Sequence, residues 1–122
     1  MGKSKLAKQR RRRLKYESYI QSQRWQRRKV EYFFLREKIC WRCGTDQHIH
    51  LHHHTYVRLG KELSEDLVPL CHTCHRRVHD LHREMGGSLT EATIQAIEEH
   101  PDHPVKFTVV LVEPSWMRRR PA

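Results

Sequence analysis

Two Cys-x-x-Cys pairs, Cys40 with Cys43 and Cys71 with Cys74, are separated by the 27 residues from 44 to 70. Each pair presents two thiolates on one short turn, and two such turns can enclose a tetrahedral zinc ion. The ion would clamp both ends of the long loop, and in a chain of 122 residues, whose core is modest, that clamp strongly constrains the fold. We therefore predict a structural Zn²⁺ site; the alternative is four reduced, buried cysteines.

Nine of the eleven histidines lie between positions 48 and 82. His75 and His79 are four residues apart on a predicted helix, so they lie on one face and can share an ion. His52 and His53 are adjacent on a predicted strand and should point to opposite sides of it. One of them can hold the ion while the other faces an attacking water, because a neutral imidazole suits a general base. These histidines predict a second metal site, separate from the cysteines.

Apolar periodicity and capping residues predict a mixture of helices and strands. Helices are expected from residue 16, from the cap Ser22 to about residue 37, from residue 71 to about 83, and from a cap at Ser88 or Thr90 to about residue 99. The helix that begins at residue 71 should stop at Gly86-Gly87. Strands are expected over residues 48–56, 56–59 and 105–112.

Positive charge is concentrated at the N-terminus. The net charge is +10, and residues 1–38 hold 14 Lys and Arg against three Glu, which accounts for all of the excess. Such a segment predicts a polyanionic partner, most simply nucleic acid, although a solubilising tail or a patch for anionic membranes would also be basic. Residues 1–15 are expected to be a disordered arm until phosphates neutralise them. The candidate phosphate contacts before position 39 are Arg10, Arg11, Arg12, Arg13, Arg24, Arg27 and Arg28.

The sequence contains no apolar run of about 20 residues, so no membrane span is expected. The basic N-terminus is not followed by an apolar stretch, which argues against a secretory signal. Both features indicate a reducing compartment, where Cys-x-x-Cys pairs bind metal more often than they form disulfides. We expect a cytoplasmic location in a bacterial or phage-infected cell.

Two segments together resemble a known nuclease family. Residues 51–56 read apolar-His-His-x-Thr-Tyr, and residues 66–79 read Asp-Leu-x-x-Leu-Cys-x-x-Cys-His-x-x-x-His. With the preceding Tyr-x-x-Tyr-Ile-x-Ser-x-x-Trp over residues 16–25, this pattern resembles the HNH family of His-Me finger endonucleases. The resemblance implies an α+β fold with a ββα-metal (His-Me finger) core and the four-cysteine zinc site. It also implies metal-dependent hydrolysis of DNA phosphodiester bonds.

The resemblance assigns roles by position. His52 matches the strand ligand of the catalytic ion, His53 the general base, and His75 and His79 the ligands on the helix. Three imidazoles favour Ni²⁺, Zn²⁺, Co²⁺ or Mn²⁺ over the harder Mg²⁺. His54 could replace His53 as the second member of the pair, but the family places an apolar residue before the pair, and only Leu51 fits.

Asp66 stands where the family usually has Asn, a residue that holds the loop rather than reacting. Asp can accept the same backbone hydrogen bonds, although its charge should make the site more negative. Arg76 and Arg77 lie one turn from the ligands and are either phosphate contacts or solvated charges.

The sequence thus predicts four regions: a basic arm (1–15), a helical basic extension (16–38), an HNH nuclease core (39–113) with a late helix and strand, and a tail (114–122). DNA is the expected partner. A single site per chain must form a homodimer, join a larger DNA-processing complex or act twice to cut both strands. The alternative function is a non-catalytic zinc module that binds DNA or RNA. A metal-storage or sensing protein would leave the basic arm unexplained.

Overall fold

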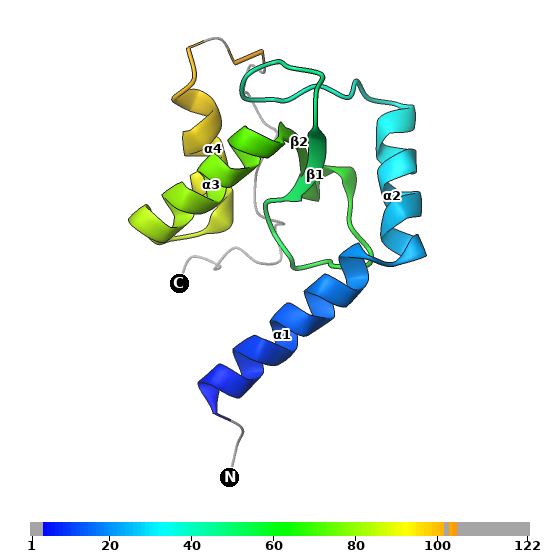
Figure 1. Ribbon diagram of the computed structural model, residues 1–122, viewed down its shortest axis with the longest axis vertical. Helices are drawn as coiled ribbons and strands as arrows, with labels where there is room; N and C mark the ends of the chain where they lie inside the picture. The colour runs from blue at the N-terminus through cyan, green and yellow to red at the C-terminus, as the bar shows by residue number, and fades with distance from the viewer. Residues whose placement is uncertain (1–3, 102, 105–122) are drawn as a thin grey trace, which may run out of the picture. The chain divides into compact units, whose positions relative to one another are not determined.

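The structure is a computed structural model that describes residues 4–101, 103 and 104. Its elements in chain order are α1 (Lys5–Ile20), α2 (Gln23–Phe34), β1 (Ile49–His53), a short 3-10 turn (Ser64–Asp66), β2 (Leu67–Cys71), α3 (His72–Met85) and α4 (Leu89–Glu98) (Figure 1). The chain divides into two compact units. The first contains the chain up to Arg36 together with Leu59–Lys61, and the second contains Glu37–Arg58 and the chain from Glu62 onward.

Helix α1 occupies most of the arm that was expected to be disordered. Ser4 caps it by accepting a hydrogen bond from the backbone N–H of Ala7, and the helix continues without a break to Ile20. The prediction of disorder was therefore wrong for residues 5–15. Lys, Arg, Leu, Ala and Gln all favour helix, whereas like charges four residues apart cost only a few tenths of a kcal/mol. None of the residues of α1 is buried, so its charged side chains stay in solvent.

Helix α2 begins where the sequence predicts. The Ser22 hydroxyl accepts a hydrogen bond from the Trp25 N–H at 3.2 Å, which confirms Ser22 as the cap. The helix ends at Phe34, three residues before the predicted end. Its buried residues are Trp25 and Tyr32, which are two helical turns apart on one face.

Strands β1 and β2 form an antiparallel pair in which Leu51 lies opposite Pro69 and His53 lies opposite Leu67. The sequence correctly predicts a strand around β1, but its returning strand over residues 56–59 was wrong. Residues 57–60 form a turn that ends at Gly60, whose φ of +91° suits glycine. The returning strand is β2 because all five of its residues are buried, and pairing satisfies their backbone groups.

Helices α3 and α4 complete the core of the second unit, and they lie against each other (Figure 1). Helix α3 starts after the cap residue Cys71 and stops at Gly86, whose φ is +70°. Helix α4 is capped by Ser88, which accepts a hydrogen bond from the Glu91 N–H. The core consists of Cys40 together with cysteines and aliphatic side chains from β2, α3 and α4, including Val68, Leu70, Val78, Leu81, Ala92, Ala96 and Ile97.

The fold is therefore α+β, with four α-helices and one two-stranded antiparallel sheet in the described part of the chain. The predicted strand over residues 105–112 and the predicted tail over 114–122 lie outside the described residues. Among the residues that the structure describes, no helix has the length and apolar character needed to cross a membrane.

Candidate metal centres

The four cysteines come together in one cluster. Cys40 and Cys43 lie on the turn that precedes β1, Cys71 ends β2, and Cys74 lies in the first turn of α3, yet their sulfur atoms are all within 4.8 Å of one another. Cys43 Sγ and Cys71 Sγ are 3.8 Å apart, and all four cysteines are free thiols. Two sulfurs that are each about 2.3 Å from a tetrahedral zinc stand about 3.8 Å apart. The cluster therefore fits a structural metal such as zinc.

Backbone N–H groups donate hydrogen bonds to two of the four sulfur atoms. The Cys40 sulfur accepts from the backbone N–H groups of Arg42 at 3.4 Å and Cys43 at 3.5 Å, and the Cys71 sulfur accepts from Cys74 at 3.4 Å. Burial opposes ionisation of Cys40, but backbone N–H donors outweigh it and lower the pKa of this thiol. Such donors stabilise the thiolate form that binds metal.

The Arg42 side chain connects the cysteine cluster to the end of α4. Its guanidinium donates to Cys74 Sγ at 3.4 Å, to the Ala96 carbonyl at 2.7 Å and to the Glu99 carboxylate at 2.9 Å. Arg77 donates to the same carboxylate at 2.7 and 3.1 Å. Arg42 had no role in the sequence prediction, because its partners lie 32 to 57 residues away. Arg77, a candidate phosphate contact, is engaged by Glu99.

Three histidines form a second cluster. His52 comes from β1, and His75 and His79 come from successive turns of α3; one ligand nitrogen from each lies within 4.8 Å of the others. The Nε2 atoms of His75 and His79 are 3.2 Å apart, and two nitrogens that are each about 2.0–2.1 Å from a tetrahedral ion stand about 3.3 Å apart. Within the described residues the cluster has three members, so an ion held here would keep a coordination position for water or substrate. These are the three ligands predicted from the sequence.

Burial keeps these imidazoles neutral. It lowers the pKa of His52 strongly, and nearby histidines lower it further. Burial, followed by His79 and His50, lowers the pKa of His75 to about 4, and burial also lowers the pKa of His79. Neutral imidazoles offer lone pairs to a metal ion without competition from protons at pH 7.

His53 points to a buried carboxylate. Its Nε2 atom is 2.7 Å from Glu62 Oε2, and both side chains are only 1% exposed. An ionised Glu62 carboxylate can only accept a hydrogen bond, which would place the proton on Nε2 and the lone pair on Nδ1. Burial lowers the pKa of His53, and Glu62 opposes this shift. The sequence prediction missed Glu62, since no motif marked a carboxylate nine residues after the histidine pair as its partner.

His54 is held at both ring nitrogens. Nδ1 lies 2.8 Å from Thr90 Oγ1, and Nε2 lies 2.6 Å from the Glu65 carbonyl oxygen. The two alternative members of the histidine pair thus differ in their surroundings. His53 is held by the Glu62 carboxylate, whereas His54, which directly follows β1, uses both ring nitrogens to contact α4 and the loop before β2.

Asp66 closes the loop that leads into β2. Its carboxylate accepts from the Leu63 N–H at 3.0 Å and from Arg58 Nε at 2.9 Å, and a second Arg58 nitrogen donates to its other oxygen. Its backbone carbonyl accepts from the His54 N–H at 3.1 Å. These contacts are the loop-holding role that the sequence predicts for this position. Arg58, which the sequence did not predict as a partner, offsets the charge of this carboxylate.

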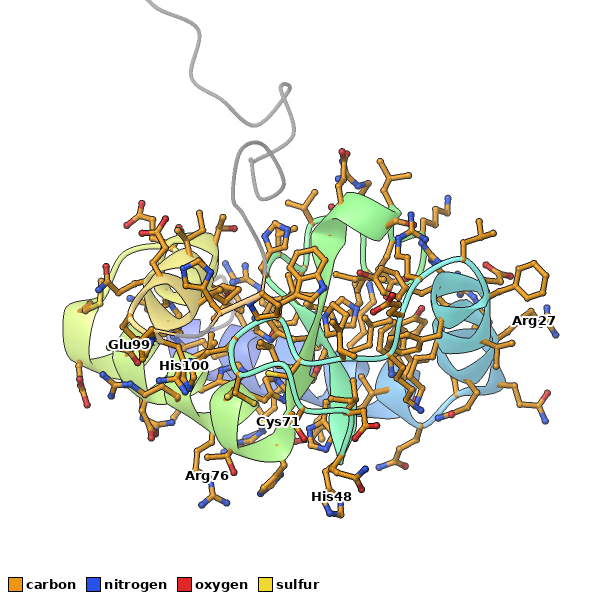
Figure 2. All side chains as sticks on the ribbon, turned by 90° about the horizontal axis from the view of Figure 1, so that it is seen from above. Arg27, His48, Cys71, Arg76, Glu99 and His100 are labelled. Atoms are coloured by element: carbon orange, nitrogen blue, oxygen red, sulfur yellow. The ribbon has the colours of Figure 1, made fainter. Side chains whose placement is uncertain are left out.

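The remaining candidate phosphate contacts lie on the helices. Arg10, Arg11, Arg12 and Arg13 are exposed on α1, and Arg24, Arg27 and Arg28 lie on α2. Arg24 donates to the Gly60 carbonyl at 2.5 Å, and Arg28 is 3.9 Å from Glu31. Figure 2 shows the Arg27 side chain pointing away from α2, and those of Arg76 and His48 projecting outward from the second unit. Arg76 also approaches His72 Nε2 at 3.3 Å.

No protein-family model matches the chain, and neither a curated protein nor a solved structure matches it significantly. What the protein does must therefore be inferred from its own chemistry. Two features carry most of that chemistry: the pair of ligand clusters on α3 and the buried His53–Glu62 pair.

Proposed function

We propose that the protein is a metal-dependent DNA endonuclease of the HNH type, which hydrolyses phosphodiester bonds with one divalent ion and a histidine base. The observation that supports this best is the pairing of His53 with a buried carboxylate, next in sequence to a ligand of the three-histidine cluster. A histidine oriented by a carboxylate is a common arrangement for a general base. A zinc module that only binds nucleic acid would need neither this pair nor a three-histidine ligand set.

The residues divide the work of hydrolysis. His52, His75 and His79 would hold the ion, which supplies positive charge to the phosphorane-like transition state and the leaving 3′ oxygen. His53 Nδ1 takes a proton from the attacking water. The Nε2–H bond to Glu62 holds the ring in place, and the carboxylate stabilises the imidazolium that forms.

The order of elements supports a ββα-metal core. The antiparallel pair of β1 and β2 leads directly into α3. Of the three proposed histidine ligands, His52 comes from β1, and His75 and His79 come from α3. The cysteine cluster, read as a structural zinc site, would brace the start of α3. Cys74, His75 and His79 all lie on α3, so both clusters depend on the same helix.

DNA is the partner that the basic helices favour. Helix α1 carries the run Arg10–Arg13 with no buried residue, as expected for a segment that contacts phosphates. One histidine cluster per chain cuts one strand at a time. Cleavage of both strands then requires a homodimer, a larger DNA-processing complex or two successive events.

A plasmid-nicking assay with Ni²⁺, Mn²⁺, Co²⁺, Zn²⁺ or Mg²⁺, with and without EDTA, tests the proposal. Wild-type protein should nick DNA with at least one ion, and EDTA should abolish nicking. His53→Ala should lose roughly two to four orders of magnitude in rate, the usual contribution of a general base. It should retain DNA binding and metal. His54→Ala is the matched control, with circular dichroism to check that each variant is folded.

Two results would redirect the proposal. Normal cleavage by His53→Ala together with inactivity of a folded His54→Ala would make His54 the base. If wild-type protein binds DNA tightly but cleaves it with none of the ions tested, the protein would instead be a non-catalytic zinc-binding module for nucleic acid.

A further inference from the structure

Helix α4 supplies a hydroxyl group to the ligand on β1. Thr93 is completely buried, and its Oγ1 lies 2.9 Å from His52 Nε2. The same Oγ1 donates to the Leu89 carbonyl, one turn earlier in α4, at 2.7 Å. His52 itself is only 1% exposed, so water does not replace these contacts.

These two distances fix the proton on the His52 ring. A threonine hydroxyl has one hydrogen, and a carbonyl oxygen can only accept. The hydrogen therefore goes to the Leu89 oxygen, a common bond of threonine in helices. Thr93 Oγ1 is left as an acceptor toward His52, so His52 Nε2 must carry the proton. In a neutral imidazole the lone pair then lies on Nδ1.

We propose that Thr93 is the positioning residue of the histidine cluster: it fixes His52 as the Nε2–H tautomer and thereby selects Nδ1 as the atom that binds the ion. This inference rests on the proposed role of the cluster as a metal site. Hydrogen bonds to the second nitrogen of a ligand histidine set its orientation and basicity, and their loss typically costs 10- to 100-fold in metal affinity.

The chain offers a matched control on the same helix. Thr90 is 7% exposed, lies one turn before Thr93, and also places its hydroxyl against a histidine of the same segment, at 2.8 Å. That histidine is His54, which is outside the ligand cluster. Thr90→Val and Thr93→Val thus each remove one hydroxyl group from α4, but only the hydroxyl of Thr93 contacts a member of the histidine cluster.

The test measures binding of Ni²⁺ by titration calorimetry to protein that retains zinc at its cysteines, with zinc content checked by elemental analysis. Thr93→Val should weaken Ni²⁺ binding 10- to 100-fold. Thr93→Ser should stay within a few-fold of wild type, because it keeps the hydroxyl, and Thr90→Val should leave Ni²⁺ affinity unchanged. Nitrogen-15 NMR of wild-type protein without Ni²⁺ should show His52 as the Nε2–H tautomer.

Several outcomes would overturn the inference. They are unchanged affinity in Thr93→Val, equal weakening in Thr93→Val and Thr90→Val, or an Nδ1–H tautomer at His52. If Thr93→Val does not fold, the Ni²⁺ affinity of Thr93→Ser and the His52 tautomer of wild-type protein, measured by NMR, still test the inference. Failure of the proposed function is separate: protein that binds Ni²⁺ through His52 Nδ1 and cuts no DNA would refute the nuclease and keep the role of Thr93.

Discussion

The two ligand clusters meet on one helix and differ in almost every other respect. Cys74 and His75 are consecutive in α3, yet Cys74 joins four sulfurs and His75 joins three imidazoles. Successive helix residues point about 100° apart, so one helix can face two sites. The cysteine cluster has the four members that a tetrahedral ion needs, and backbone N–H groups donate to two of its sulfurs. The histidine cluster lacks a fourth member within the described residues and adjoins a carboxylate-bound imidazole.

The comparison suggests how a small protein can separate stability from chemistry. A complete ligand set holds an ion without reaction, whereas an incomplete set leaves room for a substrate. Because Cys74 and His75 share a backbone, any movement of the first cluster would displace the second. A metal held by the cysteines would therefore help to fix the geometry of the histidine cluster.

Substitution of these neighbouring residues should give the largest contrast. Cys74→Ser should release zinc and unfold or aggregate the chain, because a small domain loses the free energy that its structural metal supplies. His75→Ala should keep zinc and native circular dichroism but lose the ion at the histidines and all cleavage. Zinc content and circular dichroism of both variants provide the measurement. Native, zinc-free Cys74→Ser protein would refute a structural role for the cysteines.

Deletion of residues 2–15 should affect DNA binding and neither cluster. The first 15 residues carry eight basic residues and no acidic one, and each phosphate contact contributes a slope of about −0.9 to the dependence of log affinity on log salt. The truncated protein should bind DNA more weakly, with a slope flatter by several units.

Zinc content should be unchanged by the deletion, and turnover at saturating DNA and low salt should largely survive. Binding isotherms at four salt concentrations would measure the slope. An equal slope in both proteins would mean that α1 does not contact phosphates and serves as a solubilising or partner-binding segment.

Glu62→Gln should reduce cleavage about tenfold or more while DNA affinity and both metal contents stay constant. The amide can still accept from His53 Nε2, but it carries no charge to stabilise an imidazolium. Single-turnover rates and DNA dissociation constants separate these effects. Glu65→Gln is the control, because Glu65 is exposed and contacts His54 through its backbone. A rate equal to that of wild type would remove Glu62 from the mechanism.

Acid should destabilise the protein through its histidine cluster even where the cysteines keep zinc. The unfolded chain protonates His75 near pH 6.5, whereas burial lowers its pKa in the fold to about 4. Between these values only the unfolded state binds the proton, so stability is lost as pH falls below about 6.5. Each such imidazole contributes about 1.4 kcal/mol per pH unit.

Urea unfolding of protein free of ion at the histidines, at pH 6.5 and 5.5, measures this loss. His75→Ala should show a smaller change between the two pH values than wild type. A larger or equal change in the variant would assign the pH dependence to other groups.

The sequence was most informative where the chemistry depends on local spacing. Two residues between cysteines, and three between histidines on a helix, place ligands together through backbone geometry alone. Local spacing accounts for each Cys-x-x-Cys pair and for His75 with His79, and the fold then brings the two cysteine pairs together and adds His52 to the histidines. Glu62 and Thr93 were not predicted, because the fold brings them to the histidines from 9 and 41 residues away. No local pattern encodes such contacts.

The errors in secondary structure have physical causes as well. Residues 56–59 have a pattern compatible with a strand, but β2 pairs with β1 because Leu67–Cys71 has more apolar surface to bury. The arm was judged by its charge, whereas backbone propensity favoured a helix in the absence of Gly and Pro. In the first case burial of apolar surface outweighs strand propensity, and in the second helix propensity outweighs the repulsion between like charges.

The hydroxyl groups of α4 also have a consequence for biosynthesis. Thr90 and Thr93 follow their histidine partners by 36 and 41 residues, and α4 is the last helix of the described chain. A nascent chain in which β1, β2 and α3 have emerged from the ribosome already holds every member of both clusters but still lacks these hydroxyls. On the proposed role of Thr93, His52 would be held in its final orientation only after α4 has also emerged, so translation would place the positioning hydroxyl later than the three histidines.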